Sequence, residues 1–265
     1  KIEKFDAVAN IDEIIEASDG IMVARGDLGI EVPYYDVPTI QKMLIKKANL
    51  KGIPVITATQ MLLSMTQNER ATRAEISDVA NAVLDGTDVV MLSEESAVGE
   101  DPINVVDTMH NIIAKTEGIY NYDKQYEMPY LDEFDVIQAT VTKLADDLKA
   151  NGILALTSSG KSALKMSRYR PRTPIFTFTH KKKVLNSLTA IWGVEPIGII
   201  KEAQASKMFQ KMLKSLDEIG KLKKDGLYVA TVGYPVGMPG STNTIKILTP
   251  SEIEYYLNFK EKKSK

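Results

Sequence analysis

The fold is decided by the stretch Ile21-Met22-Val23-Ala24-Arg25-Gly26-Asp27-Leu28-Gly29, in which four apolar residues are followed at once by charge and glycine. The apolar run has the length of a short buried strand, and the segment after it is typical of the start of a helix. Further apolar runs at 53–57 and 89–92 are also strand candidates, and helical patterns lie between them. Alternating strands and helices with short loops predict parallel βαβ units.

The helices between these strands have recognisable ends. One pattern begins near Thr39 and is predicted to stop at Gly52. The string Thr72-Arg73-Ala74-Glu75 is a capping box, in which the threonine hydroxyl and the glutamate carboxylate each accept an early helix N–H. The helix that follows is predicted to stop at Gly86.

Polar residues that can carry chemistry follow each strand, at a spacing that suits one βα unit each. They are Lys1 and Glu3, then Arg25 and Asp27, then Thr59, then Ser93 and Glu95. In a TIM barrel such strand ends converge on one face, where active sites lie. A doubly wound sheet also binds ligands at its strand ends, so the repeat alone does not separate the two folds.

The first candidate site combines Lys1, Glu3 and Asp27. Lys1 and Glu3 are two residues apart in an expected strand, so their side chains share a face. Glu3 and Asp27 would supply two carboxylates, the usual protein share of a Mg²⁺ shell. The alternatives are a surface ion pair between Lys1 and Glu3, and a helix-capping role for Asp27.

The next two strand ends carry hydroxyl groups. Thr57 and Thr59 are predicted to point to one face and to order water or donate to an oxyanion, although threonine is also common in strands. Ser93 and Glu95 are likewise predicted to share a face, and they can equally be a helix cap followed by acids in the first turn.

A polar and aromatic stretch at 121–129 separates a second α/β half from the first, so we predict domains at 1–121 and 122–265. The second half has predicted strands at 153–157, 175–179, 194–200, 227–232 and 245–248, and predicted helices near 136–149, 162–168, 181–191 and 204–216. This pattern favours an open α/β sheet.

One turn of the second half favours phosphate binding. Thr157-Ser158-Ser159-Gly160-Lys161-Ser162 follows a strand and opens a helix, so hydroxyls, a lysine and helix N–H groups lie together. The turn lacks the first glycine of a Walker A loop, and a plain capped βα turn is the alternative. The Gly/Pro-rich loop at 233–243 would close over such a phosphate, or is only a long hairpin connection.

The composition excludes several classes of protein. The 265 residues carry 33 basic and 35 acidic side chains, so the net charge of -2 argues against partners such as nucleic acid or a membrane surface. Without cysteine there is no disulfide or thiolate metal site, which fits a reducing compartment. The two histidines, His110 and His180, are far apart and offer neither a serine-hydrolase triad nor zinc spacing.

Taken in order, the strings at 1–3, 21–29, 58–62, 72–83 and 91–93 resemble the pyruvate kinase family, and so does Arg168-Tyr169-Arg170-Pro171. The resemblance implies the last strands of a TIM (β/α)8 barrel followed by a regulatory α/β domain. It also implies a cytoplasmic homotetramer that transfers the phosphoryl group of phosphoenolpyruvate to ADP, giving pyruvate and ATP in glycolysis.

The resemblance implies roles for individual residues. Lys1 neutralises the phosphoryl group in flight, Glu3 and Asp27 bind Mg²⁺, and Thr59 lies beside the carbon that is protonated. Ser93 and the backbone of Ala24, Arg25, Gly26 and Asp27 contribute to substrate binding. The turn from Thr157 to Ser162 binds the phosphate of an effector; because 233–238 lacks the arginine of fructose-bisphosphate-regulated members, we expect a monophosphate or no effector.

The resemblance places Lys1 on the fifth barrel strand, so we expect a fragment whose K⁺ ligands and most nucleotide contacts lie outside the chain. Residues 1–265 alone are therefore expected not to turn over. Two alternatives are a Mg²⁺-dependent, enolate-forming aldolase or lyase, and a non-catalytic module that binds phosphorylated metabolites.

Overall fold

The computed structural model describes residues 1–265 except 124–127, 203, 234–241 and 260–265. The chain divides into two compact units, Lys1–Asn121 and Tyr122–Lys265. The first unit has a three-stranded parallel sheet and the second a five-stranded mixed sheet, and neither closes into a barrel within the described residues. The predicted fold class, a partial barrel followed by an open α/β sheet, is confirmed.

The sheet of the first unit orders its strands β1 (Ile21–Ala24), β2 (Val55–Ala58) and β3 (Val89–Met91), all parallel. The segment before β1 adds to this sheet, because Ile2 forms a parallel bridge with Val23. Its amide donates to Met22 O at 2.7 Å, and its carbonyl accepts from Ala24 N at 3.0 Å. The residues that flank Ile2 therefore lie beside the carboxyl end of β1.

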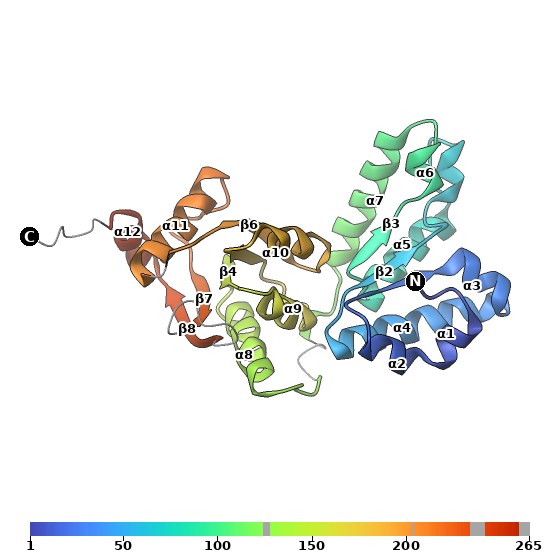
Figure 1. Cartoon of the computed structure of the whole chain (residues 1–265). Helices are drawn as coiled ribbons and strands as arrows, with labels where there is room; N and C mark the ends of the chain where they lie inside the picture. Colours follow the sequence, from blue (N-terminus) through green and yellow to red (C-terminus); the bar gives the residue numbers. More distant parts are fainter. Residues whose placement is uncertain (124–127, 203, 234–241, 260–265) are drawn as a thin grey trace, which may run out of the picture. The chain divides into compact units, whose positions relative to one another are not determined.

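Helices cover the sheet of the first unit (Figure 1). They are α1 (Phe5–Ala9), α2 (Ile11–Glu16), α3 (Arg25–Glu31), α4 (Val37–Lys51), α5 (Arg73–Asp85), α6 (Glu94–Ala97) and α7 (Pro102–Glu117), with short 3-10 turns η1 (Tyr34–Asp36) and η2 (Leu63–Thr66). Leu44 and Ile45 of α4 pack with Ile2 and Val23 in one buried cluster. This burial fixes the Ile2 segment against β1.

The predicted helix ends of this unit are confirmed. Gly52 and Gly86 end α4 and α5 with φ of 78° and 93°, in the left-handed region that glycine adopts without a Cβ clash. Thr72 and Glu75 form the predicted capping box at the start of α5. Glu75 also accepts hydrogen bonds from the amide and hydroxyl of Ser64, at 2.7 and 2.5 Å, and so ties η2 to α5.

We expect Glu75→Ala to lower the free energy of unfolding by about 1–3 kcal/mol, since both cap and turn lose their acceptor. Burial alone would raise the pKa of Glu75, but hydrogen bonds from Ser64 and Thr72 outweigh it and lower the pKa. This contribution is therefore full above the unfolded pKa and is lost as the pH falls through the folded one. Urea titrations between pH 7 and pH 3 check this, and Glu75→Gln, which keeps an acceptor without charge, should show a weaker pH dependence.

The second unit is a three-layer sandwich. Its strands are β4 (Gly152–Leu156), β5 (Ile175–Thr179), β6 (Val194–Ile199), β7 (Tyr228–Gly233) and β8 (Thr242–Leu248), in the spatial order β6-β5-β4-β7-β8, with only β8 antiparallel to its neighbour. Its helices are α8 (Glu133–Asp147), α9 (Lys161–Arg168), α10 (Lys182–Ser187), α11 (Ala205–Glu218) and α12 (Pro250–Leu257), with the 3-10 turn η4 (Leu188–Ala190) (Figure 1).

Alternation along β4 assigns the two faces of this sheet. Leu154 joins the cluster of α11 and α12, whereas Ile153 and Ala155 join the cluster of α8 and α9. The chain runs from β4 outward to β6 and then returns to β7, on the other side of β4. Ligands of open α/β sheets bind at the carboxyl ends of strands where the order reverses in this way. In this unit that point lies between β4 and β7.

Several element boundaries differ from the predictions by a few residues, and two of the differences have a local cause. The strand predicted at 53–57 is β2, which begins at Val55 because Pro54 has no N–H to give to a ladder. The helix predicted at 181–191 is shorter, since α10 ends at Ser187 and η4 follows. The hydroxyl of Ser187 donates to Val184 O at 2.9 Å, a local bond that competes with helical pairing.

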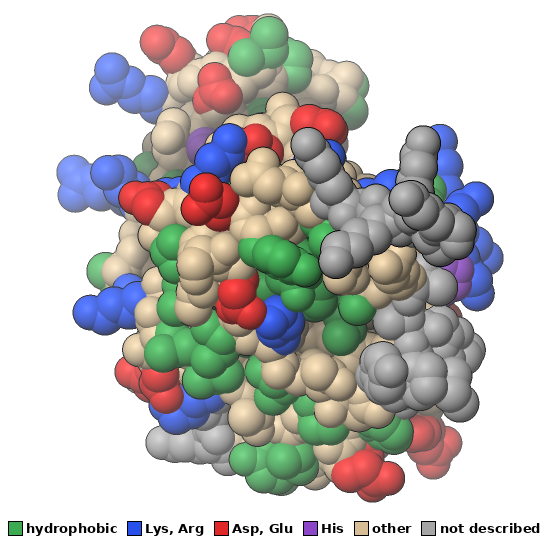
Figure 2. All heavy atoms as spheres, turned by 90° about the vertical axis from the view of Figure 1, so that its left-hand side faces the viewer, with side chains coloured by type: hydrophobic (Ala, Val, Ile, Leu, Met, Phe, Trp, Pro, Cys, Tyr) green, Lys and Arg blue, Asp and Glu red, His purple; other side chains and the backbone are tan. Residues whose placement is uncertain are grey.

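The surface carries charges of both signs. On the face drawn in Figure 2, acidic and basic side chains are interspersed with hydrophobic ones. Among the described residues, no helix combines the length and the apolar character needed to cross a membrane.

Candidate functional site

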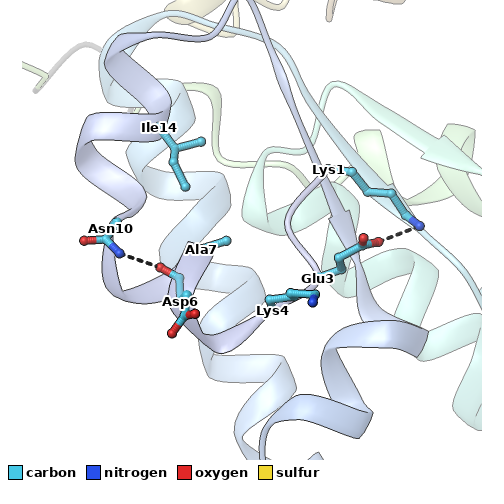
Figure 3. Close-up of a pocket in the computed structure, with 7 residues that line it drawn as sticks. All are labelled: Lys1, Glu3, Lys4, Asp6, Ala7, Asn10 and Ile14. Atoms are coloured by element: carbon cyan, nitrogen blue, oxygen red, sulfur yellow. Dashed lines mark hydrogen bonds and ion pairs between the residues drawn. The ribbon is translucent and has the colours of Figure 1, made fainter.

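Lys1, Glu3 and Asp27 meet at the carboxyl end of β1. The ammonium of Lys1 lies 2.6 Å from Glu3 Oε2 and 2.9 Å from Asp27 Oδ2, and Figure 3 shows the pair that it forms with Glu3. The three side chains are 52%, 34% and 52% exposed, so the cluster faces solvent. Two carboxylates separated by 24 residues in the sequence thus share one cation.

The backbone explains why these side chains meet. Ile2 is buried and bridges Val23, so its neighbours Lys1 and Glu3 point away from the core together. Asp27 lies in the first turn of α3, which starts directly after β1. Its carboxylate forms the ion pair with Lys1, while the side chain at the N-cap position of α3, Ala24, caps nothing.

The electrostatics favour the charged forms of Lys1 and Asp27. The close Glu3 carboxylate, and then the hydrogen bond to Asp27, raise the pKa of Lys1 above its ordinary value. The hydrogen bond from Lys1 in turn lowers the pKa of Asp27. A cation therefore persists between the two carboxylates across the neutral range.

The donor set fits a magnesium ion. Glu3 Oε2 is a buried atom that is ion-paired to Lys1, yet it receives no hydrogen bond of proper geometry within the described part of the chain. Within that same part, no group of three or more His, Asp or Glu side chains is placed to hold a metal. Two carboxylates with water and substrate oxygens are nevertheless a usual Mg²⁺ shell, so Glu3 and Asp27 fit this ion as its protein ligands.

A cavity of about 370 Å³ adjoins this cluster on the side of α1 and α2 (Figure 3). Its lining consists of Lys1, Glu3, Lys4, Asp6, Ala7, Asn10 and Ile14. Of the cluster, Lys1 and Glu3 line the cavity, whereas Asp27 is not among the lining residues. The cluster therefore adjoins an open space.

Thr59 approaches the same place from β2. Its hydroxyl accepts from Gly26 N at 2.8 Å and donates to Ala58 O at 2.6 Å. Its φ of 69° is left-handed, so the alternation of strand side chains ends before it. The prediction that Thr57 and Thr59 share a face is therefore wrong. Thr57 instead points into the interior, where it donates to the Thr87 hydroxyl at 3.0 Å.

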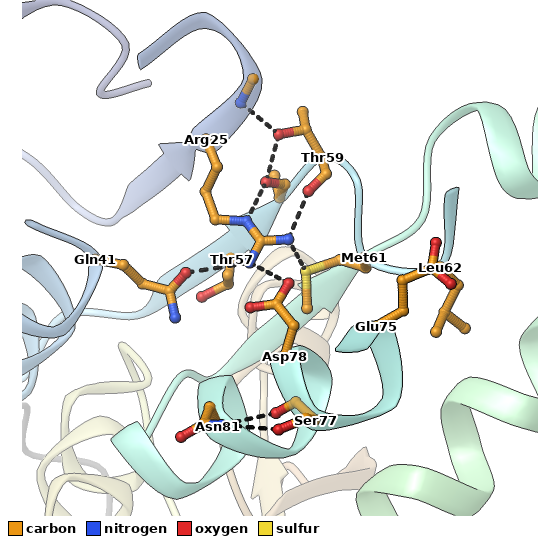
Figure 4. Close-up of polar contacts among 12 residues, drawn as sticks. Arg25, Gln41, Thr57, Thr59, Met61, Leu62, Glu75, Ser77, Asp78 and Asn81 are labelled. Carbon is orange, nitrogen blue, oxygen red and sulfur yellow. Dashed lines mark hydrogen bonds and ion pairs between the residues drawn. The ribbon is translucent and has the colours of Figure 1, made fainter. Parts of the chain in front are cut away.

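The predicted carboxylate cradle, residues Ala24 to Asp27, has two amides in use. Ala24 N donates to Ile2 O at 3.0 Å, and Gly26 N donates to the Thr59 hydroxyl. The Arg25 side chain turns away from this segment and reaches Asp78 and Gln41, as Figure 4 shows. Only the backbone of Arg25 thus belongs to the predicted cradle, and its binding role stays a prediction.

Ser93 precedes the short helix α6, and its side chain makes no capping bond there. Its amide donates to Glu95 Oε2 at 2.7 Å, and Leu62 N donates to Glu95 Oε1 at 3.1 Å. Glu95 is only 1% exposed. It therefore ties Leu62, in the segment after β2, to Ser93, which follows β3. The acids lie in the first turn of α6, as the alternative expects, but Ser93 does not cap this helix.

Asp78 had no site role in the sequence reasoning, and Glu95 was a candidate only together with Ser93. Asp78 forms an ion pair with Arg25 at 2.5 Å, although 53 residues separate them. Glu95 accepts from Leu62 N, 33 residues away in the segment that follows β2. Such contacts are set by tertiary packing, so no local sequence pattern predicts them.

The predicted phosphate turn lies at the carboxyl end of β4. Thr157 Oγ1 accepts from Gly160 N at 3.0 Å, and α9 begins at Lys161. Ser162 and Thr242 face each other with their hydroxyl oxygens 3.0 Å apart. Thr242 begins β8, so the turn adjoins the end of the predicted flap, of which residues 234–241 lie outside the described part.

Comparison with known families decides the relationship. A profile described as "Pyruvate kinase, barrel domain" matches residues 1–106, and one described as "Pyruvate kinase, alpha/beta domain" matches residues 135–248. The chain belongs to the pyruvate kinase family. In this family setting, the cluster of Lys1, Glu3 and Asp27 lies in the barrel match, and the turn at 157–162 lies in the α/β match.

Individual pyruvate kinases are similar over most of the chain. The enzyme of Clostridium acetobutylicum is 46% identical over 251 residues, 93% of this chain and 53% of the relative. That of Geobacillus stearothermophilus is 44% identical over 257 residues, 96% of this chain and 44% of the relative. That of Lactobacillus delbrueckii subsp. bulgaricus is 44% identical over 253 residues, 93% of this chain and 43% of the relative. The chain thus spans about half the length of the curated pyruvate kinases it matches.

Proposed function

We propose that the full-length protein carrying this chain transfers the phosphoryl group of phosphoenolpyruvate to ADP, giving pyruvate and ATP. The observation that carries the proposal is that Glu3 and Asp27 share one cation at the end of β1. This cation is the Lys1 ammonium, whose Nζ lies 2.6 Å from Glu3 and 2.9 Å from Asp27. Phosphoryl transfer needs positioning and charge neutralisation more than covalent chemistry. A lysine beside two metal-binding carboxylates supplies both.

In this proposal Glu3 and Asp27 would hold Mg²⁺. The chemistry that Mg²⁺ supplies when bound is Lewis-acid neutralisation of the phosphoryl and enolate oxygens. Lys1 pairs with both carboxylates here; with Glu3 and Asp27 engaged as metal ligands, its ammonium would be available to the anionic substrate. Lys1 then neutralises the phosphoryl group while it passes between the two oxygens.

The transfer breaks the bond between the enol oxygen and phosphorus, and it forms a bond from an oxygen of the ADP β-phosphate to that phosphorus. The enolate left behind takes one proton on its methylene carbon, which becomes the methyl group of pyruvate. We assign Thr59 to this half-reaction, because its hydroxyl lies against Gly26, next to Asp27. Ser93 and the backbone from Ala24 to Asp27 are assigned to substrate binding.

For the second unit we propose the binding of a phosphorylated effector, a monophosphate, at Thr157, Ser158, Ser159, Gly160, Lys161 and Ser162. The support is the position of this turn at the point between β4 and β7 where the strand order reverses. The family likeness further supports a homotetramer in the cytoplasm, and K⁺ ligands outside residues 1–265.

The test measures pyruvate formation in an assay coupled to lactate dehydrogenase. It compares the natural full-length protein with residues 1–265 alone. We expect the full-length protein to form pyruvate and ATP in equal amounts when given phosphoenolpyruvate, ADP and Mg²⁺, and the chain alone to form neither. Omitting ADP is the control. Phosphoenolpyruvate binding without ATP formation would instead favour the binding module, and cleavage of a carbon–carbon bond in a keto acid would favour a lyase.

A further inference from the structure

The side chain of Arg25 is buried behind the carboxyl ends of β1 and β2, with 9% of its surface exposed. It donates from Nε to Ala58 O at 3.3 Å and from Nη2 to Thr59 O at 2.7 Å (Figure 4). These two carbonyls belong to the peptide units on either side of the Thr59 α-carbon. One guanidinium therefore restrains both backbone torsions of Thr59.

The opposite edge of the guanidinium is anchored to two helices. Nη1 pairs with Asp78 Oδ2 of α5 at 2.5 Å and donates to Gln41 Oε1 of α4 at 3.3 Å (Figure 4). The planar fork of arginine suits several simultaneous hydrogen bonds of fixed direction, which a lysine ammonium does not reproduce. The position of Arg25 is thus set by packed elements and not by solvent.

The restrained backbone needs such support. Thr59 and Gln60 have φ of 69° and 55°, and a left-handed conformation is unfavourable for a β-branched residue. It persists only where surrounding contacts over-determine it. The contacts from Arg25 meet this condition, and the result is a Thr59 hydroxyl held 2.8 Å from Gly26 N.

We propose that Arg25, anchored by Asp78, is a positioning residue that fixes the Thr59 hydroxyl for protonation of the enolate carbon. Arg25 acts through Thr59 and does not touch the substrate with its side chain. The inference rests on the proposed function, in which Thr59 serves the proton-transfer half-reaction. It adds a determinant outside the charged cluster of Lys1, Glu3 and Asp27.

The test separates proton transfer from phosphoryl transfer in the full-length protein. Proton NMR measures the exchange of the pyruvate methyl hydrogens in D₂O, with Mg²⁺ and inorganic phosphate present. This exchange reports proton transfer alone. We expect Arg25→Lys to slow this exchange about 10–100-fold per folded protein and to change KM for phosphoenolpyruvate less than threefold. Asp78→Asn should slow it about 3–10-fold, since the carbonyl contacts remain. Arg70→Lys, the same change at an exposed arginine, should match wild type.

A double-mutant cycle distinguishes positioning from general destabilisation. If Arg25 acts through Thr59, then Arg25→Lys adds little to the defect of Thr59→Val, so the double variant exchanges the methyl hydrogens at the rate of Thr59→Val alone. Multiplicative defects would overturn the inference. Wild-type exchange in Arg25→Lys, with Thr59→Val impaired, would overturn it while leaving the proposed function intact.

Amide hydrogen exchange of residues 58–62, measured by mass spectrometry, is the readout that does not need activity. The inference expects at least tenfold faster exchange in Arg25→Lys than in wild type or Arg70→Lys. If wild type showed no turnover, the proposed function would fall. Faster amide exchange would then still support the restraint on Thr59, and unchanged exchange would overturn that as well.

Discussion

Lys1→Met should lower kcat of the full-length protein by about 10²–10³-fold, the usual effect of removing one preorganised charge from a transition state. Lys1 pairs with Glu3 and Asp27 at 2.6 and 2.9 Å, and these partners raise its pKa. The ammonium is thus present at neutral pH, and the variant removes it without opening a core. A stopped-flow or coupled assay of pyruvate formation gives the rate.

The same variant, Lys1→Met, should lower kcat without lowering the affinity for Mg²⁺. Without the competing ammonium, Glu3 and Asp27 should bind Mg²⁺ at least as tightly as in wild type, which titration calorimetry measures. Lys4→Met is the matched control, since Lys4 lines the neighbouring cavity and is exposed. It should change neither quantity more than twofold. Retention of a tenth or more of wild-type kcat in Lys1→Met would remove Lys1 from the mechanism.

The sequence predicted this cluster because its geometry follows from the chain's periodicity. Strands leave their polar neighbours at one edge of a parallel sheet, so Glu3 and Asp27 were expected to lie close together. The capping box at Thr72 and the stop at Gly86 were equally readable, since their partners lie within four residues. The short helices α1 and α2 gave no usable signal, because five or six residues hold too few turns for a periodic pattern.

What the sequence did not predict depends on long-range contacts. The left-handed Thr59 follows from Arg25, whose own anchor Asp78 is 53 residues away. Likewise Glu95 was a candidate only together with Ser93, whereas its second donor, Leu62 N, comes from the segment that follows another strand. The partners of such polar side chains are set by tertiary packing, and the sequence alone does not identify them.

The second unit repeats this lesson in a buried polar cluster. The string at 168–171 was noted for its family likeness, but its partner was not. In the structure Asp135 Oδ2 accepts from Arg168 Nη1 at 2.9 Å, from Tyr169 OH at 2.8 Å and from Leu131 N at 2.8 Å. Arg168 and Asp135 are fully buried. Burial, and then the hydrogen bond to Asp135, also raise the pKa of Tyr169, which keeps its hydroxyl a donor.

Asp135→Asn should therefore lower the unfolding free energy of the second unit by about 3–5 kcal/mol, because it removes the buried carboxylate charge that faces the Arg168 guanidinium. Denaturation in urea, followed by the fluorescence of Trp192, reports this unit, since Trp192 is the chain's one tryptophan and is buried. Asp147→Asn is the matched control on the same helix. Its pair with Lys143 is exposed, so the loss should stay within about 1 kcal/mol.

The partner's removal gives the sharper test of the mechanism. If the loss in Asp135→Asn comes from the missing charge opposite the buried guanidinium, then Arg168→Met in the same chain should restore part of the stability, since the guanidinium charge is gone and the methionine fills much of the space. Additive losses in the double variant would show instead that each side chain stabilises the unit by packing alone. A loss below 1 kcal/mol in Asp135→Asn would mean that water reaches Arg168 and replaces the carboxylate, contrary to the burial of both side chains.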